Sequence, residues 1–235
     1  MPQHHTNSHR NRLLGALSPR DLKLLSPHLE SLSLALRHPI EQRNKPIKHV
    51  YFMEEGIASV VAAGDDGKEI EVGLIGREGM TGLVVLMGNH QSPHNVYVQV
   101  RGQAQRMGAA EFRKALGASK TMRTLLLKFA QSFMVQTAHT AIANGRANVE
   151  QRLARWVLMA RDRVDDDELP LTHEFLSLML GVRRAGVTVA LNGLEERTVI
   201  KANRGHVRVL DRKGLEKIAQ GYYGVPEAEL RRLMA

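Results

Sequence analysis

The spacing of hydrophobic positions changes along the chain, and the change separates a strand-rich segment from helical ones. From about residue 37 to residue 107, glycines are frequent and short runs of β-branched residues recur. In the stretch HVYFMEEGIASVVAAGDDGKEIEVGLIG, apolar Ile70, Val72 and Leu74 alternate with Glu69, Glu71 and Gly73 after a GDDG turn. This period of two predicts a strand with one buried face. NVYVQVRGQAQRM adds a strand pair, so we expect an all-β barrel, roll or sandwich.

Helical spacing dominates on both sides of this segment. The stretch NRLLGALSPRDLKLLSPHLESLSLAL has leucines at helical intervals, with Ser18 and Pro19 as a predicted helix start. A long helix is predicted from about Ala109 to Ala143, with a possible break near Gly117. Steps of three and four place one set of its residues on a common apolar side. That set, our predicted dimer interface, is Met122, Leu126, Phe129, Phe133, Met134, Thr137 and Ala141.

Two short helical patterns meet at Gly181 in LTHEFLSLMLGVRRAGVTVALNGLEERTVI, which spans residues 171–200. Thr172 is suited to cap the first helix. The second helix buries Val187, Ala190, Leu191 and Leu194 on one side. Its opposite side carries Arg183, Arg184, Ala185, Gly186 and Thr188.

This second helix has the residue types that a helix needs in order to approach base pairs. Small side chains permit close contact, and arginine donates in a fork that matches the two acceptors of guanine. We therefore predict a helix-turn-helix whose second helix enters the DNA major groove. An arginine pair alone would equally suit a solvated helix face.

A basic hairpin follows the two helices in TVIKANRGHVRVLD. Arg204, His206 and Arg208 are spaced by two, so we expect them to share a face and to contact phosphates or the minor groove as a wing. Between residues 182 and 213, eight Lys or Arg oppose three acids, a net charge of +5. We predict that the acidic VDDDELP segment before the helices is a solvated loop.

Composition narrows the class of protein further. The 235 residues carry a formal net charge of +9, which favours an anionic partner. The chain contains no cysteine, which excludes disulfides, thiolate nucleophiles and Cys-ligated clusters. No nucleophile–base pair or convergent set of metal ligands is recognisable, so we expect neither an enzyme nor a cofactor. Because no apolar run is long enough for a bilayer, we expect a cytoplasmic protein without a membrane partner.

From about Asn11 onward, the chain resembles the Crp/Fnr family of bacterial transcription regulators. The resemblance rests on VYFMEEGIASVVAAGDDGKEIEVGLIGREGMTG, the long helix, LTHEFLSLMLGVRRAGVTVALNGLEE and GHVRVLDRKGLEKIA, in the family's order. It implies an α+β protein with an N-terminal β-roll related to cyclic-nucleotide-binding domains. The expected parts are a flexible tail (1–10), the sensor domain (11–118), a dimerisation helix (119–144) and a winged helix-turn-helix (145–235). Expected partners are a second copy, an imperfectly palindromic duplex DNA and RNA polymerase.

The sequence departs from the family pattern at its ligand and DNA sites. Gly76, Gly79 and Gly82 lead into Leu83 where the nucleotide binders have glutamate. Further along, His94-Asn95 stands where the nucleotide binders have Arg-Ser or Arg-Thr. A buried cyclic phosphate needs a permanent cation, and this pair does not supply one. We therefore expect a possible ligand pocket at Gly76, Gly79, Gly82, His94 and Asn95 that does not bind cyclic AMP.

The recognition helix reads Arg-Arg-Ala-Gly instead of Ser-Arg-Glu-Thr, with Arg184 at the base-reading position. We therefore expect its target sequence to differ from the well-known family operators. The alternative function is a ligand-sensing β-roll that acts through protein contacts instead of DNA.

Overall fold

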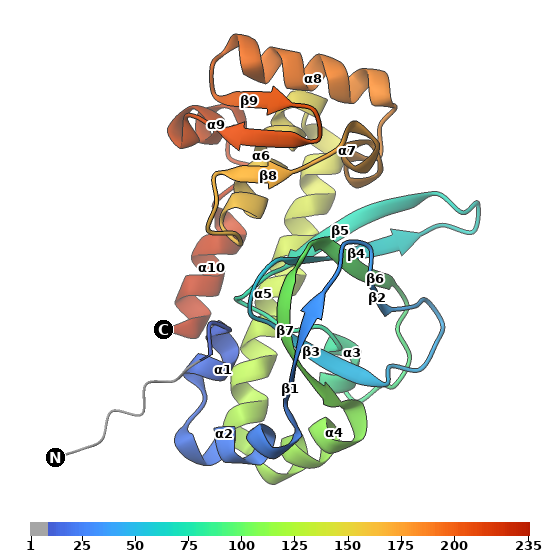
Figure 1. Ribbon diagram of the computed structural model, residues 1–235, viewed down its shortest axis with the longest axis vertical. Helices are drawn as coiled ribbons and strands as arrows, with labels where there is room; N and C mark the ends of the chain where they lie inside the picture. The colour runs from blue at the N-terminus through green and yellow to red at the C-terminus, as the bar shows by residue number, and fades with distance from the viewer. Residues whose placement is uncertain (1–8) are drawn as a thin grey trace, which may run out of the picture.

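The computed structural model describes residues 9–235 and contains a β-roll, a long central helix and a helical C-terminal domain (Figure 1). His4 and His5 of the expected tail lie outside the described residues. His9 and Arg10 were also assigned to that tail, but His9 contacts Glu54 at 3.0 Å and Arg10 pairs with Glu55. The described part of the N-terminal segment is therefore attached to the β-roll.

Two antiparallel sheets form the β-roll, with strand orders β1-β7-β3 and β2-β6-β4-β5. Short helices precede them and interrupt them. The elements in chain order are α1 (Arg12–Ala16), α2 (Pro19–Leu25), the 3-10 turn η1 (Ser26–His28), β1 (Glu30–Leu34), β2 (Pro39–Glu41), β3 (His49–Met53), β4 (Ile57–Ala63), β5 (Glu69–Ile75), α3 (Leu83–Leu86), β6 (Asn95–Val100), β7 (Gly102–Gly108) and α4 (Ala109–Ala118).

The central helix α5 (Lys120–Arg146) begins after Ser119, whose hydroxyl accepts a hydrogen bond from the Met122 N–H at 3.1 Å. The same hydroxyl donates to Asp21 of α2 at 2.6 Å. Ser119 thereby both caps α5 and connects it to the N-terminal helices. The predicted helix is therefore divided in two at Ser119, close to the possible break expected near Gly117.

The C-terminal domain contains the predicted pair of helices, a small sheet and two final helices. A three-stranded sheet has the order β8-β10-β9. The elements are α6 (Val149–Arg161), β8 (Glu168–Pro170), α7 (His173–Leu180), α8 (Arg184–Glu196), β9 (Ile200–Asn203), β10 (His206–Val209), α9 (Arg212–Ile218) and α10 (Val225–Met234). The predicted acidic loop thus ends in a strand, because Leu169 pairs with Val207 of β10.

The β-roll and the C-terminal domain share a hydrophobic core. Ile57, Val61 and Leu74 of the β-roll are buried in the same cluster as Trp156 of α6 and Met179 of α7. On another side of the domain, α10 runs along α5 and contacts it (Figure 1). The orientation of the C-terminal domain is therefore determined by contacts on two sides.

The shared core corrects the prediction that β5 has one buried face. Glu71 was expected on the polar face, yet it is buried, with 5% of its surface exposed. The C-terminal domain covers that face, and the Trp156 indole N–H donates to Glu71 Oε1 at 2.7 Å.

Candidate nucleic-acid interface

The helix-turn-helix is formed by local capping and by one glycine. The Thr172 hydroxyl accepts a hydrogen bond from the Phe175 N–H at 3.2 Å and so caps α7, as predicted. Gly181 ends α7 with φ +60°, a left-handed conformation that favours glycine. Arg183 is the N-cap of α8 without a side-chain capping bond, so this helix lacks the usual serine cap.

The two sides of α8 differ as predicted. Val187, Ala190, Leu191 and Leu194 are buried against the rest of the domain. Arg183, Arg184, Ala185 and Thr188 are exposed, and Gly186 is half-buried. The helix lies at the end of the molecule away from the β-roll (Figure 1).

The structure adds Val189 and Asn192 to this exposed surface, and neither was a predicted site residue. Val189 is 72% exposed, unusual for a branched apolar side chain, and Asn192 is exposed one turn after Thr188. Continuing the four-residue step from Arg184 through Thr188 would have identified Asn192 from sequence. We define Arg184, Ala185, Thr188, Val189 and Asn192 as the reading face.

Polar contacts hold part of the reading face in place without burying it. An Arg184 guanidinium nitrogen lies 3.1 Å from a Glu174 carboxylate oxygen, and both side chains are about two-thirds exposed. The Thr188 hydroxyl lies 3.2 Å from His173 Nδ1 and donates to the Arg184 carbonyl. An exposed ion pair contributes only ~0–1 kcal/mol, so Arg184 loses little stabilisation when it leaves Glu174 to contact another hydrogen-bond acceptor.

The predicted wing is the hairpin of β9 and β10. Gly205, with φ +80°, forms its turn beside Arg204. His206 and Arg208 are exposed and lie on the same face, as expected from their spacing, while Arg204 lies in the turn. Lys201 is paired in register with Arg208 and adds to this charge, whereas Glu168 of β8 lies 3.3 Å from Arg208 and partly neutralises it.

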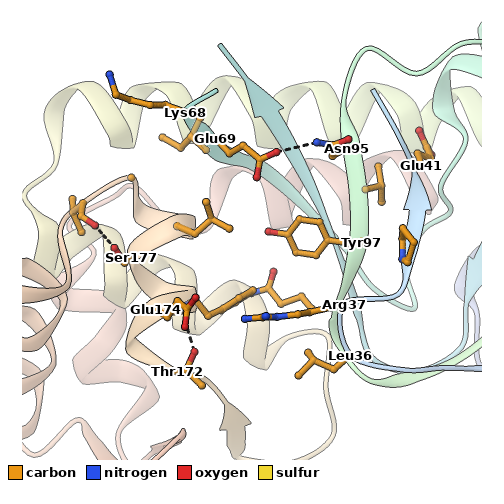
Figure 2. Close-up of a pocket in the computed structure, with 18 of the residues that line it drawn as sticks. Leu36, Arg37, Glu41, Lys68, Glu69, Asn95, Tyr97, Thr172, Glu174 and Ser177 are labelled. Carbon is orange, nitrogen blue, oxygen red and sulfur yellow. Dashed lines mark hydrogen bonds between the residues drawn. The ribbon is translucent and has the colours of Figure 1, made fainter. Parts of the chain in front are cut away.

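A cleft of about 1200 Å³ lies between parts of the β-roll and α7. Figure 2 shows Tyr97 and Arg37 of the β-roll opposite Glu174 and Thr172 of the C-terminal domain. Asn95 lies in this cleft, where its side-chain amide donates to Glu69 at 2.9 Å. Asn95, which the sequence predicts as part of a ligand pocket, therefore lies at the junction between the domains.

A second cavity, of about 470 Å³, lies between the β-roll and α5, and we call it the sensor pocket. Of the predicted pocket residues, Gly82 and His94 line it. Glu41, which sequence analysis did not select, also lines it, and its carboxylate accepts a hydrogen bond from the Gly82 N–H at 2.6 Å. Burial raises the pKa of Glu41, while burial and Arg43 lower the pKa of His94.

Gly76 and Gly79 are absent from the described lining of the sensor pocket, contrary to expectation. A Cβ on Gly79 would lie 2.2 Å from the Phe129 ring of α5, and one on Gly76 would lie 2.7 Å from Arg163. Gly79 permits this loop to contact α5 closely, and Gly76 permits it to contact Arg163, two residues after α6. Arg163 also forms a buried ion pair with Glu78 of the same loop at 2.7 Å.

Two family models match the chain in succession. Residues 33–119 match the cyclic nucleotide-binding domain, and residues 151–218 match the Crp-like helix-turn-helix domain. The chain belongs to the Crp/Fnr family of DNA-binding transcriptional regulators. The resemblance inferred from sequence is confirmed, as is the mixed fold of β-roll, long helix and helix-turn-helix domain. The family and its structural neighbours are regulators and not enzymes.

Solved structures of Crp/Fnr regulators share this fold at low sequence identity. A Crp/Fnr-family regulator from Eubacterium rectale is 19% identical with a TM-score of 0.69, and the match covers 89% of this chain and 98% of that one. FixK2 from Bradyrhizobium japonicum is 15% identical, with a TM-score of 0.69 and coverage of 81% and 96%. TTHB099 from Thermus thermophilus is 20% identical, with a TM-score of 0.66 and coverage of 80% and 96%.

No curated protein sequence matches the chain. Within residues 9–235 of this Crp/Fnr protein, no helix is long and apolar enough to cross a membrane. Within the same residues, no group of three or more His, Cys, Asp or Glu is arranged to hold a metal ion.

Proposed function

We propose that the protein is a homodimeric, sequence-specific transcriptional regulator whose α8 helices enter successive major grooves of a palindromic DNA site. The observation that carries this proposal is the reading face, an exposed and largely small-residue surface beside a basic wing. Two-fold symmetry predicts half-sites about one helical turn apart, ~34 Å. As a regulator of chromosomal genes, the protein would act in the cytoplasm, with RNA polymerase as a further partner.

Within the reading face, each side chain has a distinct expected role. Arg184 suits the two acceptors of guanine, and Asn192 suits the donor–acceptor pair of adenine. The exposed Val189 methyl groups suit contact with a thymine methyl group. Lys201, Arg204, His206 and Arg208 of the wing would contact phosphates, which position the domain without reading sequence.

The dimer would form along α5, through a face that retains only Met134 and Ala141 of the set predicted from sequence. Met122, Leu126 and Phe129 are buried in the β-roll core, and Phe133 packs against it. The three buried residues are therefore unavailable to a second chain, while Phe133 and Thr137 are half-buried at the sensor pocket. The original set was apolar because the helix covers its own sensor domain.

A separate exposed stripe on α5 has the spacing of a helix–helix contact. Its residues recur at intervals of three and four. Those nearest the C-terminal end of α5 are small, which permits close approach of a second helix. The dimer stripe is Thr124, Leu127, Gln131, Met134, Ala138, Ala141 and Gly145. Leu127 is 40% and Met134 66% exposed, and both would be buried against the same stripe of a second copy.

The sensor pocket is unsuited to cyclic AMP for an electrostatic reason. The Gly82 N–H, which is oriented to receive an anion, already donates to the Glu41 carboxylate. The described residues that line the pocket include no lysine or arginine. A cyclic phosphate would lose its water and face an acid instead of a cation. Isothermal titration should detect no micromolar binding of cyclic AMP.

The decisive experiment selects DNA from random duplexes and then tests Arg184→Ala on the selected site. We expect the variant to lose ~1–3 kcal/mol of discrimination between that site and random DNA in competition gel shifts. Arg113→Ala is a matched control, because Arg113 is exposed on α4 at the opposite end of the molecule. Equal weakening on both DNAs would refute base reading by Arg184. No salt-sensitive DNA binding at all would favour a regulator that acts through protein contacts.

A further inference from the structure

The sensor pocket has predominantly apolar walls. Val60 and Ile75 of the β-roll form one side, Leu83 of α3 another, and Phe133 and Met134 of α5 a third. Its volume of about 470 Å³ lies within the range of ~300–1,000 Å³ that is common for small-molecule sites. A cavity of ~150 Å³ with apolar walls already accommodates benzene, so this one has room for two or three rings.

Several polar groups in the pocket are already bonded to other protein atoms. Glu41 accepts from the Gly82 N–H, and the Ser92 hydroxyl donates to the His94 carbonyl at 2.8 Å. The Thr137 hydroxyl donates to the Phe133 carbonyl at 3.1 Å. A ligand would therefore find few free hydrogen-bonding partners, and apolar contact would supply most of its affinity.

The charges present in the pocket disfavour an anionic ligand. Glu41 is the one carboxyl among the described lining residues, which contain no lysine or arginine, and His94 is the other ionisable group. Because the pKa of His94 is lowered, its imidazole is largely neutral at pH 7. An anion would meet no permanent positive charge, whereas an uncharged molecule would lose little on leaving water.

We propose that the sensor pocket binds an uncharged, largely apolar molecule of two or three rings instead of a nucleotide. The proposal rests on the assignment of the protein as a regulator and names the class of its effector. The position of the pocket suits that role, because Met134 and Ala138 both line the pocket and belong to the dimer stripe. A bound ligand would therefore touch the helix through which two copies are proposed to associate.

The test uses the full-length protein and N-phenyl-1-naphthylamine, an uncharged dye whose fluorescence rises in apolar surroundings. We expect saturable binding that excess cyclic AMP does not reverse. Leu83→Lys places a cation on the half-buried pocket wall and should weaken binding at least tenfold. Its control is Leu36→Lys, because Leu36 is 58% exposed and lines the interdomain cleft instead. This control should bind the dye like the unmodified protein.

A second pair of variants tests the α5 wall with less risk to folding. Ala138→Phe should fill the pocket and weaken dye binding at least tenfold, whereas Ala141→Phe, on the same stripe but outside the described pocket lining, should not. Unchanged dye binding in both Leu83→Lys and Ala138→Phe, or displacement by cyclic AMP, would overturn the proposal. The titration needs no DNA, so a failure to bind duplex would refute the proposed function separately.

Discussion

Replacing Glu71 by glutamine should make the stability of the protein less dependent on pH, because Glu71 is a buried acid at the junction of the two domains. Its Oε2 accepts a hydrogen bond from the Ser59 hydroxyl at 2.5 Å, and its Oε1 accepts one from the Trp156 indole at 2.7 Å. Burial raises its pKa from 4.5 to about 7, although these bonds and the charges of Arg155 and Arg163 oppose the rise.

The direction of the pH effect follows from this raised pKa. The folded protein holds the Glu71 proton more tightly than the unfolded chain, so the resulting stabilisation is complete below pH 4.5 and is lost as pH rises through about 7. Each unit of difference between the two pKa values corresponds to ~1.4 kcal/mol. Between about pH 5.5 and 8.5, the folded protein should lose about 2 kcal/mol through this group.

Glutamine at position 71 carries no charge at any pH but retains both kinds of hydrogen bond. Its oxygen accepts from Trp156, and its amide donates to Ser59. The unfolding free energy of Glu71→Gln, minus that of the unmodified protein, should therefore increase by about 2 kcal/mol between about pH 5.5 and 8.5. The attraction between ionised Glu71 and Arg155 is already included in the pKa of about 7, so its loss in the variant needs no separate correction.

Urea unfolding followed by tryptophan fluorescence measures this difference directly, because Trp156 is the one tryptophan of the chain and contacts Glu71. Glu69→Gln serves as control, since it removes a carboxylate from the same strand at the cleft instead of the shared core. A stability difference for Glu71→Gln that is the same at both pH values would refute the reasoning.

Three further predictions concern charge and assembly. Arg208→Ala should weaken binding to all DNA sequences alike and reduce the slope of log affinity against log salt by ~1, as measured by gel shifts at several salt concentrations. Met134→Arg should shift dimers toward monomers in sedimentation velocity, whereas Lys128→Arg, also exposed on α5 but outside the stripe, should not. Arg163→Met leaves Glu78 buried and unpaired, so urea unfolding should show a loss of ~3–5 kcal/mol that adding Glu78→Gln largely reverses.

Features that depend on neighbours in sequence were predictable from sequence. Thr172 caps α7 because its hydroxyl reaches the backbone three residues ahead, and Gly181 ends that helix because a left-handed residue is needed there. The buried side of α8 follows from helical period, since Val187, Leu191 and Leu194 are all buried. The exposed side of the same helix follows with it, including the position of Arg184.

Assignments that needed a knowledge of distant neighbours were less successful. The period of α5 predicts an apolar side but does not show what covers it, so it places Met122, Leu126 and Phe129 in a dimer contact although the β-roll buries them. The glycines of the 76–82 loop were all assigned to a ligand, yet Gly79 accommodates Phe129 and Gly76 accommodates Arg163. The same residue types serve a ligand or a close helix contact, and spacing alone does not distinguish them.

The sequence by itself determined the order of the domains, the caps and turns of the helix-turn-helix, and the cationic surface that it exposes, because these depend on period, local hydrogen bonds and charge. Tertiary structure alone decided that Glu71 is buried beneath Trp156 and that Glu41 occupies the Gly82 N–H. Glu71 and Trp156 are 85 positions apart in the sequence, and Glu41 and Gly82 are 41 positions apart. The free energy of such contacts depends on which surfaces meet after folding, and no local pattern encodes it.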